Sequence, residues 1–199
     1  MSRPFDPRSD ADVLALVRAY PLAWVIGRGG AMDPFDATPL PLLPELDAGG
    51  RLVSFLGHFA LANPQVDALR ADPRALLLFN GPQGYISPRL VGDPTWGPTW
   101  NYAVARFTVR IAFAPDENAY ALETLAATLE AGSPTPWRPE QMGPDYPRKR
   151  RHIIAFHAHV EQARPTFKLG QDEEPGTFRE IVHGIDDTAL RDWMVSQRD

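Results

Sequence analysis

The most constraining feature of this sequence is an alternating segment that runs from Ala103 to Phe113. Every second residue in it is apolar, and the residues between are mostly polar or charged, with Val104 and Ala112 as exceptions. A period of two predicts a β-strand with one buried and one exposed face, as in an antiparallel sheet. The apolar run 75–79 is too short for a globular helix and predicts a buried strand that ends at Gly81-Pro82.

The residues between these two strands have a different character. Residues 83–89 are rich in Gly and Pro and predict a loop, and residues 98–102 lead into the alternating strand. The connection is dense in Tyr, Ser, Trp, Asn and Arg. It therefore predicts a rim that faces a ligand beside a packed core.

The remaining elements indicate an α+β fold that is mainly antiparallel. Ser9 and Asp12 resemble a capping box at the start of a helix that Pro21 ends. The strands and helices do not alternate regularly, and the chain has 21 prolines, which favours a barrel or sandwich with peripheral helices. Further strands are expected at 22–26, 37–42 (an edge strand), 51–56 and 153–160, and further helices after Asn63, after Asp116 with an apolar core stripe Leu122, Leu125, Ala126 and Leu129, and near the C-terminus.

Composition limits the domain organisation and the class of protein. The 199 residues suit one domain, 1–199, with an N-terminal helix at 1–21 and a C-terminal helical tail at 172–199. The net charge of −5 argues against nucleic-acid binding over the whole surface, although the basic run 148–151 could contact phosphates or be a solvated flank. The absence of cysteine excludes thiolate chemistry. No apolar run suggests a membrane span or signal peptide, so a cytoplasmic protein is expected.

Several motifs that often carry chemistry are weak or absent. The glycine cluster 27–30 is followed by Met32 where a dinucleotide fingerprint needs glycine, so a hairpin turn is favoured. His157 and His159 share one face of a strand, but they lack a third metal ligand of matching parity. No nucleophile elbow or Walker loop is present. No metal site and no catalytic residue are assigned.

A phosphorylated aromatic cofactor fits the rim residues better. FMN needs cations and hydroxyl donors for its phosphate, and apolar or aromatic walls for its ring. The ring candidates are Tyr85, Trp96 and Trp100. The phosphate candidates are Thr38, His58, Ser87, Arg89 and Lys168.

Five motifs occur in order along the chain: Ala37–Leu42, Gly57–Ala60 with Asn63–Gln65, Gly81–Ser87, Pro98–Tyr102 and Phe167–Leu169. Together they resemble the PaiB-type family of FMN-binding negative transcriptional regulators. The resemblance covers most of the chain, from the first strand to Gln171, and implies an FMN-binding split β-barrel related to pyridoxamine-phosphate oxidases. It also implies a homodimer with flavin at the subunit interface, and it adds Asn101 and Gln171 to the candidate cofactor site.

The chain departs from this family pattern at several rim positions. A histidine of the pattern is replaced by Pro39 and another by Gln83, while Leu61 replaces a frequently basic residue. Gly170 and Asp172 replace a serine and an asparagine. Each lost charged contact is expected to cost roughly 1.5–3 kcal/mol of phosphate binding. The resemblance therefore predicts the scaffold more strongly than the affinity for its ligand.

Three functions follow from these observations. The resemblance implies a flavin-binding regulator, in which direct DNA binding has little support from the sequence. An alternative is a flavin-dependent oxidoreductase in which Tyr85, Trp100 or Asn101 orients a small substrate. A third is a split-barrel dimer that has lost flavin and binds another small phosphorylated ligand.

Overall fold

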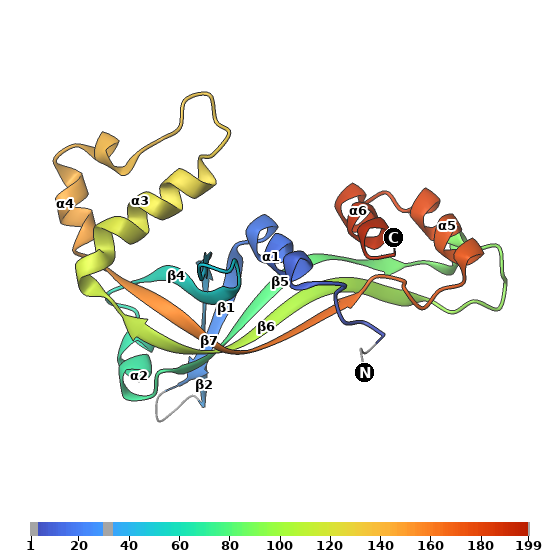
Figure 1. Ribbon diagram of the computed structural model, residues 1–199, viewed down its shortest axis with the longest axis horizontal. Helices are drawn as coiled ribbons and strands as arrows, with labels where there is room; N and C mark the ends of the chain where they lie inside the picture. The colour runs from blue at the N-terminus through green and yellow to red at the C-terminus, as the bar shows by residue number, and fades with distance from the viewer. Residues whose placement is uncertain (1–3, 30–33, 199) are drawn as a thin grey trace. The chain divides into compact units, whose positions relative to one another are not determined.

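The computed structural model describes residues 4–29 and 34–198, which form the helices and strands drawn in Figure 1. The strands are β1 (Leu22–Arg28), β2 (Phe35–Pro41), β3 (Leu43–Leu46), β4 (Leu52–Ala60), β5 (Arg74–Ile86), β6 (Thr99–Phe113) and β7 (Ile153–Lys168). The helices are α1 (Asp10–Ala19), α2 (Gln65–Ala71), α3 (Asn118–Leu129), α4 (Asp145–Arg150), α5 (Pro175–Gly184) and α6 (Thr188–Ser196). Short 3-10 helices occupy Pro88–Leu90, Pro115–Glu117 and Pro139–Met142.

The strands form one sheet in the order β2-β1-β5-β6-β7-β4-β3. The pairs β1–β2, β1–β5, β3–β4 and β4–β7 are all antiparallel. The predicted α+β class with mainly antiparallel strands is therefore confirmed. The strand expected at 37–42 is also confirmed as an edge strand, since β2 is the first strand of the sheet. An edge is where a Pro-rich strand is tolerated, because proline cannot donate to a neighbouring strand.

The chain divides into two compact units. Unit 1 comprises residues 1–20, 80–105 and 164–199, and unit 2 comprises residues 21–79 and 106–163. The long strands β5, β6 and β7 each contribute one part to each unit. The single domain 1–199 expected from the sequence stays a prediction, which limited proteolysis would test.

Unit 2 is built around phenylalanine rings. Phe107 lies 5.0 Å from Phe55 and 5.8 Å from Phe79 between ring centroids, and both contacts are edge-on. Phe59 packs against Phe156 at 5.0 Å. Phe55, Phe79, Phe107, Phe59 and Phe156 are all buried, so these contacts anchor the inner face of the sheet. Edge-on and tilted ring pairs add stability beyond the area that they bury.

The alternating segment behaves as its sequence predicts. Along β6 the buried positions are Asn101, Ala103, Ala105, Phe107, Val109 and Ile111. The residues between them are exposed or half-buried. In α1, Ser9 and Asp12 form the predicted capping box, and Leu16 and Val17 are fully buried.

Two predicted breaks in the strands are wrong. β5 does not end at Gly81-Pro82 but continues through the expected loop to Ile86, and β7 passes through Pro165 to Lys168. β1 pairs with β5 only at Ala75–Phe79, and β4 pairs with β7 only at Ile153–His159. Both prolines therefore lie outside these two paired stretches, so neither removes an N–H from the pairing with β1 or β4.

Gly81 serves a close approach rather than a turn. A Cβ atom at this position would collide with Leu16 of α1 and would lie 3.0 Å from the carbonyl oxygen of Ala103. The glycine lets α1 pack directly on the hairpin of β5 and β6 in unit 1. Gly81 suggested the end of a strand, but its role in the structure is to allow close packing.

The helices also differ from the prediction in places. α3 begins at Asn118 rather than after a cap at Asp116, and the Asn118 side chain bonds the carbonyl of Ile153 and the N–H of Ala155. The predicted core stripe is confirmed in part: Leu125 packs against the buried cluster of Leu43, Leu56, Ala121 and Ala155, but Leu129 is 54% exposed. Leu122, Leu125 and Ala126 are half-buried. The helix after Asn63 is confirmed as α2, with Val66 and Leu69 buried.

The glycine cluster after β1 is described in part. Gly27 and Arg28 belong to β1 and pair with Asp36 and Phe35 of β2, in agreement with a hairpin. Gly30 and Met32, which decided against the dinucleotide interpretation, lie outside the described residues.

Candidate functional site

The candidate cofactor residues fall in both units. Thr38 and His58 belong to unit 2. Tyr85, Ser87, Arg89, Trp100, Asn101, Lys168 and Gln171 belong to unit 1. The two groups are considered separately below.

In unit 1 the structure brings Tyr85, Trp100 and Lys168 together. The rings of Tyr85 and Trp100 lie 6.1 Å apart at an angle of 54°. They remain 54% and 50% exposed, although each is large and apolar. The Trp100 indole N–H donates to the side-chain oxygen of Gln83 at 2.7 Å. We call Gln83, Tyr85, Trp100 and Lys168 the aromatic cluster.

Lys168 supplies the positive charge of the aromatic cluster. Its ammonium group donates to the hydroxyl of Thr99 and, at 3.3 Å, to the carbonyl of Trp100. An ammonium group has three protons, so a third donor position is left for an anion. These contacts also fix the start of β6 against the end of β7.

Ser87 and Arg89 follow Tyr85 directly along the chain. The Ser87 hydroxyl accepts from the backbone N–H of Arg89 at 3.2 Å and thereby caps the short helix Pro88–Leu90. Its proton remains a donor. The Arg89 side chain is exposed and makes no ion pair or hydrogen bond with the described part of the chain. Its guanidinium group is therefore available to an anionic ligand.

Asn101 and Gln171 make structural contacts instead. Asn101 is 1% exposed and donates to the sulfur of Met194 in α6 at 3.6 Å. The Gln171 side chain accepts from the N–H of Leu169 at 2.7 Å and donates to the carbonyl of Phe167. Trp96 donates to Glu173 at 3.0 Å. A ligand role for Asn101 or Gln171 stays a prediction.

In unit 2, Thr38 belongs to a hydrogen-bonded chain of side chains. Its hydroxyl accepts from the Asn63 amide at 3.0 Å, and the Asn63 oxygen accepts from the N–H of Gln65 at 2.9 Å. The fully buried Gln65 amide donates to the carbonyls of Val25 and Asp36 at 2.9 and 3.2 Å. This chain of contacts fixes β2 and the start of α2, and leaves the Thr38 proton free to donate.

His58 lies in β4, opposite Ala155 of β7. Burial lowers the pKa of this imidazole, because the charged form loses hydration. The side chain is thus neutral at physiological pH. It can offer a hydrogen bond to a ligand but no permanent positive charge.

Sequence reasoning missed the parts that Gln83, Thr99 and Asn63 play in these two groups. From the sequence, Gln83 was notable only because it replaces a histidine of the family pattern, and Asn63 only because it precedes a helix. Gln83, Asn63 and Thr99 contact partners that lie 17, 25 and 69 positions away. Alternation within one strand gives no signal for such contacts between strands.

The histidine pair of unit 2 is part of an ion-pair network. Nδ1 of His157 lies 2.8 Å from Glu45, and Nε2 lies 3.2 Å from Glu117. The His159 ring stacks at 6.2 Å from it. Among residues 4–29 and 34–198, no three His, Cys, Asp or Glu side chains are grouped so that they could hold a metal. Both nitrogens of His157 are used by carboxylates.

This network predicts a pH-dependent stability. Burial opposes the charged form of His157, but the hydrogen bonds to Glu45 and Glu117 outweigh it and raise the pKa. A raised pKa stabilises the fold below the unfolded-state pKa near 6.5, and this contribution disappears as the pH rises through the folded-state pKa. We expect His157→Gln to lose up to about 1 kcal/mol of the stability gained on acidification.

Urea unfolding of both proteins between about pH 6 and pH 8 measures this difference. His152→Gln is the matched control, because His152 is exposed and should keep the wild-type pH dependence. Equal pH slopes for wild type and His157→Gln would mean that the two carboxylates do not stabilise the imidazolium.

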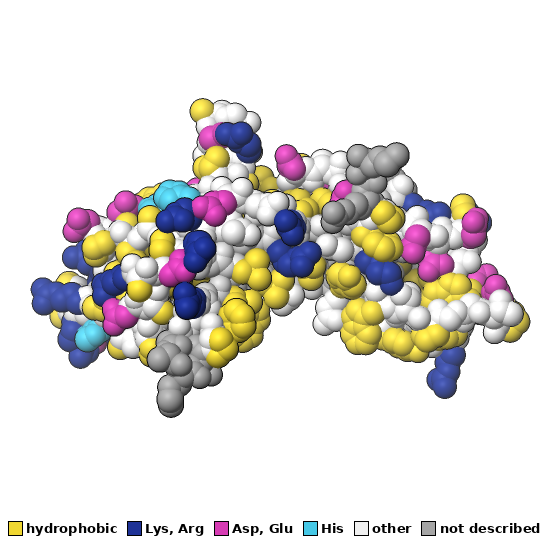
Figure 2. Space-filling view, turned by 90° about the horizontal axis from the view of Figure 1, so that it is seen from below, with side chains coloured by type: hydrophobic (Ala, Val, Ile, Leu, Met, Phe, Trp, Pro, Cys, Tyr) yellow, Lys and Arg dark blue, Asp and Glu magenta, His cyan; other side chains and the backbone are white. Residues whose placement is uncertain are grey.

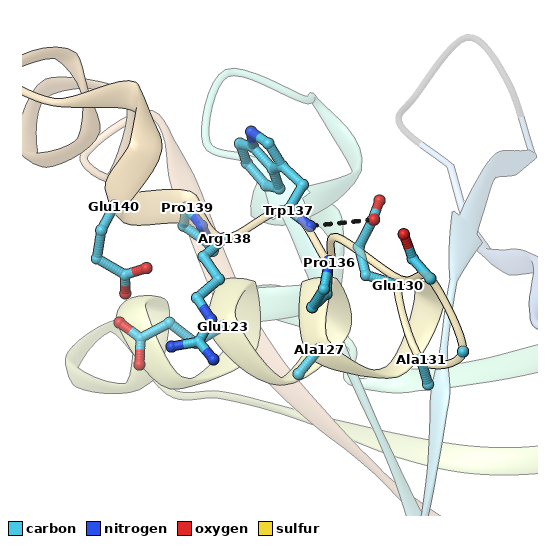
Figure 3. Close-up of a pocket in the computed structure, with 11 residues that line it drawn as sticks. Glu123, Ala127, Glu130, Ala131, Pro136, Trp137, Arg138, Pro139 and Glu140 are labelled. Atoms are coloured by element: carbon cyan, nitrogen blue, oxygen red, sulfur yellow. Dashed lines mark hydrogen bonds between the residues drawn. The ribbon is translucent and has the colours of Figure 1, made fainter.

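Unit 2 also contains cavities away from the candidate residues. A cavity of about 410 Å³ lies between α3 and the following loop, and is lined by Trp137, Arg138 and Glu140 among others (Figure 3). The backbone N–H of Trp137 donates to the Glu130 carboxylate, which also lines this cavity, at 3.1 Å. A second cavity of about 540 Å³ lies beside Arg28, Arg74 and Phe35. Neither cavity contains a predicted cofactor residue.

The residues of unit 1 fit an aromatic phosphate ester. Tyr85 and Trp100 present half-exposed ring faces, which suit a planar ring system. Lys168, Arg89 and Ser87 carry the kinds of donor that a phosphate needs, and in the described part of the chain no hydrogen bond joins Arg89 or Ser87 to the aromatic cluster. Charge-assisted donors of this kind bind phosphate oxygens most strongly. This chemistry matches FMN.

The comparisons with known proteins agree with this chemistry. Residues 1–162 match the family model described as "Putative FMN-binding domain". The protease synthase and sporulation protein PAI 2 of Bacillus subtilis (strain 168) is 28% identical over 131 residues, which cover 65% of this chain and 63% of that protein. The chain thus matches less than two thirds of the length of this curated relative.

Solved structures share the fold at low identity. The flavocytochrome Anf3 of Azotobacter vinelandii has a TM-score of 0.61 at 17% identity, covering 80% of this chain and 67% of that one. The protein Rv2991 of Mycobacterium tuberculosis has a TM-score of 0.60 at 13% identity, covering 85% and 92%. The FAD and heme binding protein of Mycobacterium smegmatis has a TM-score of 0.58 at 15% identity, covering 89% and 78%.

Two further results complete the comparison with the sequence predictions. No helix within residues 4–29 and 34–198 is long and apolar enough to span a bilayer. The family match covers more than three quarters of the chain and includes four of the five ordered motifs. The predicted resemblance is confirmed, and this chain belongs to the family of FMN-binding domains.

Proposed function

We propose that this protein binds FMN and acts as a flavin-responsive regulator of the PaiB type. The observation that carries the proposal is the family match over residues 1–162. The aromatic cluster of unit 1 supports it, because two exposed aromatic rings lie 6.1 Å apart there and Lys168 contacts the backbone of one of them. The match to the PAI 2 protein supports the regulatory part.

The residues of unit 1 would take distinct parts in binding. Trp100 and Tyr85 would pack against the flavin ring, and Lys168, Arg89 and Ser87 would donate to the phosphate. In unit 2, Thr38 and His58 would offer hydrogen bonds to a ligand of that unit. Bound FMN supplies electron and hydride transfer. The protein would supply binding, orientation and the exclusion of water from the ring.

A comparison of FMN with riboflavin tests this assignment. Riboflavin has the same ring system but no phosphate, so it cannot use the cationic donors. We expect riboflavin to bind more weakly than FMN when flavin fluorescence is followed during titration with the protein. Equal affinities would overturn the assignment of Lys168, Arg89 and Ser87 to the phosphate.

We further propose a homodimer. In unit 2, Leu22, Trp24 and Phe35 are 61%, 42% and 74% exposed on the outer face of β1 and β2. Trp24 stands opposite Pro39 and Leu78, so this face is apolar across three strands. Figure 2 shows patches of hydrophobic side chains on the face of the molecule that it presents. An exposed apolar face of this kind commonly marks an interface.

A second copy of the chain is the proposed partner, because the family resemblance implies a flavin site at a subunit interface. Light scattering coupled to size exclusion would measure the mass of the wild type and of Trp24→Lys. A monomeric wild type at micromolar concentration would contradict the dimer.

Direct DNA binding is the least supported part of the regulator proposal. α4 carries Arg148, Lys149 and Arg150 in its last turn, but Arg148 pairs with Asp145 and Arg150 lies over the Tyr146 ring. The net charge of −5 opposes binding at other surfaces. A gel-shift assay at graded salt would show retardation at low salt if this segment contacts phosphates. A cytoplasmic location likewise stays a prediction.

The half-exposed ring faces favour a second candidate function. Tyr85 and Trp100 are 54% and 50% exposed, so a small substrate could reach a planar ring that is bound against them. A flavin-dependent oxidoreductase would use this space for hydride transfer. Oxidation of a reduced nicotinamide by the FMN-loaded protein, measured by absorbance, would distinguish this function from a purely regulatory one.

A further inference from the structure

Gln83 forms a hydrogen bond with Trp100, one of the two exposed aromatic residues of the aromatic cluster. Its side-chain oxygen accepts the Trp100 indole N–H at 2.7 Å, and both side chains lie at the surface. Gln83 and Tyr85 are two residues apart in β5, so they project from the same face of the strand. The indole therefore meets an acceptor and an aromatic neighbour that come from one strand.

These contacts compensate for the exposure of Trp100. Trp100 is 50% exposed, so packing alone does little to restrict its side chain to one rotamer. Here the ring edge is held by Gln83, and the ring lies 6.1 Å from Tyr85 between centroids. Lys168 holds the backbone carbonyl of the same residue at 3.3 Å. The hydrogen bond and the ring contact thus favour this orientation of the indole before any ligand arrives.

From this geometry we propose that Gln83 is a positioning residue, which orients the Trp100 indole as a fixed wall for the planar ring of the bound flavin. The inference rests on the proposed function, because it concerns the same cofactor. A side chain that is ordered before binding does not lose its rotamer freedom on binding. Removing the acceptor should therefore weaken FMN binding by about 2- to 10-fold, without removing any contact to the flavin itself.

Gln83→Leu tests the proposal, because the leucine side chain is of similar size but has no hydrogen-bond acceptor. Gln83→Glu restores an acceptor oxygen at the same position. Gln162→Leu is the matched control, since Gln162 is an exposed glutamine of β7 whose side chain makes no hydrogen bond with the described part of the chain. FMN affinity is measured by titration, and thermal unfolding is recorded for each variant.

The orientation of Trp100 has its own readout. Near-ultraviolet circular dichroism of the flavin-free protein reports fixed aromatic rings, and the spectrum of Trp100→Phe identifies the contribution of this indole among the five tryptophans. We expect Gln83→Leu to lose most of that contribution. Gln83→Glu should keep it, and Gln162→Leu should match the wild type.

A double-mutant comparison decides between positioning and a general effect on stability. We expect Gln83→Leu to raise the FMN dissociation constant in the wild-type background but not in Trp100→Phe. An equal increase in both backgrounds, or no increase in the wild type, would overturn the proposal. A wild type that binds no FMN would overturn the proposed function itself. A wild type that binds FMN with the same affinity as Gln83→Leu would overturn only the role of Gln83.

Discussion

Replacement of Phe107 by alanine should lower the free energy of unfolding by about 3–5 kcal/mol, the largest effect that we expect from a single substitution. Phe107 is 1% exposed, and its ring lies edge-on to Phe55 and Phe79 at 5.0 and 5.8 Å. The substitution removes both contacts and leaves a cavity between β4, β5 and β6. Urea unfolding followed by far-ultraviolet circular dichroism would measure the loss.

Arg106→Ala is the matched control for this prediction. Arg106 precedes Phe107 in β6 but is exposed on the opposite face, so its removal should change the stability by less than about 0.5 kcal/mol. Similar losses for the two variants would contradict the assignment of the inner and outer faces of β6. Since Phe107 belongs to unit 2, the unfolding of that unit is the transition to follow.

Lys168→Met should weaken FMN binding by about one to two orders of magnitude. A charge-assisted contact to phosphate is worth roughly 1.5–3 kcal/mol, and methionine keeps most of the apolar stem while removing the charge. Lys168 also holds Thr99 and the carbonyl of Trp100, so part of the loss would come from a less ordered indole. Titration of each protein with FMN would measure the change in affinity.

Lys149→Met is the control, because it removes the same charge from the exposed helix α4. Riboflavin separates the two contributions of Lys168. If Lys168 binds the phosphate, Lys168→Met should affect riboflavin far less than FMN. If both flavins weaken equally, the lysine acts only through Trp100, and its assignment to the phosphate is wrong.

The fold could be predicted largely from patterns within single segments. The alternation at 103–113 predicts the buried face of β6, and the capping box at Ser9 and Asp12 marks the start of α1. The edge position of β2 follows from its prolines. Each of these signals is local, because the residues that carry it belong to the element that it predicts.

The sequence failed where the outcome depended on a neighbouring element. Gly81-Pro82 and Pro165 suggest breaks, but β5 and β7 continue through them. The pairing with β1 ends at Phe79 and the pairing with β4 ends at His159, so these prolines remove no N–H from either pairing. The stripe of α3 suggests a core helix, but Leu129 remains exposed. Local patterns do not report how far a partner strand or a core extends.

The candidate site could be predicted in its chemistry but not in its arrangement. Residue types alone selected Tyr85, Trp100 and Lys168, which the structure brings together. They could not show that Asn101 faces Met194 in α6 or that Gln171 bonds its own backbone. These contacts join residues that only the folded chain brings into reach.

The central claim is that this chain binds FMN, and the absorbance spectrum of the purified protein tests it most directly. The protein would be purified from a host with ample flavin, dialysed, and then titrated with FMN. We predict flavin bands that persist through dialysis or appear on titration with saturation at one flavin per chain, and release of FMN on heating. A protein that stays colourless and leaves FMN fluorescence unchanged at tens of micromolar would contradict the claim.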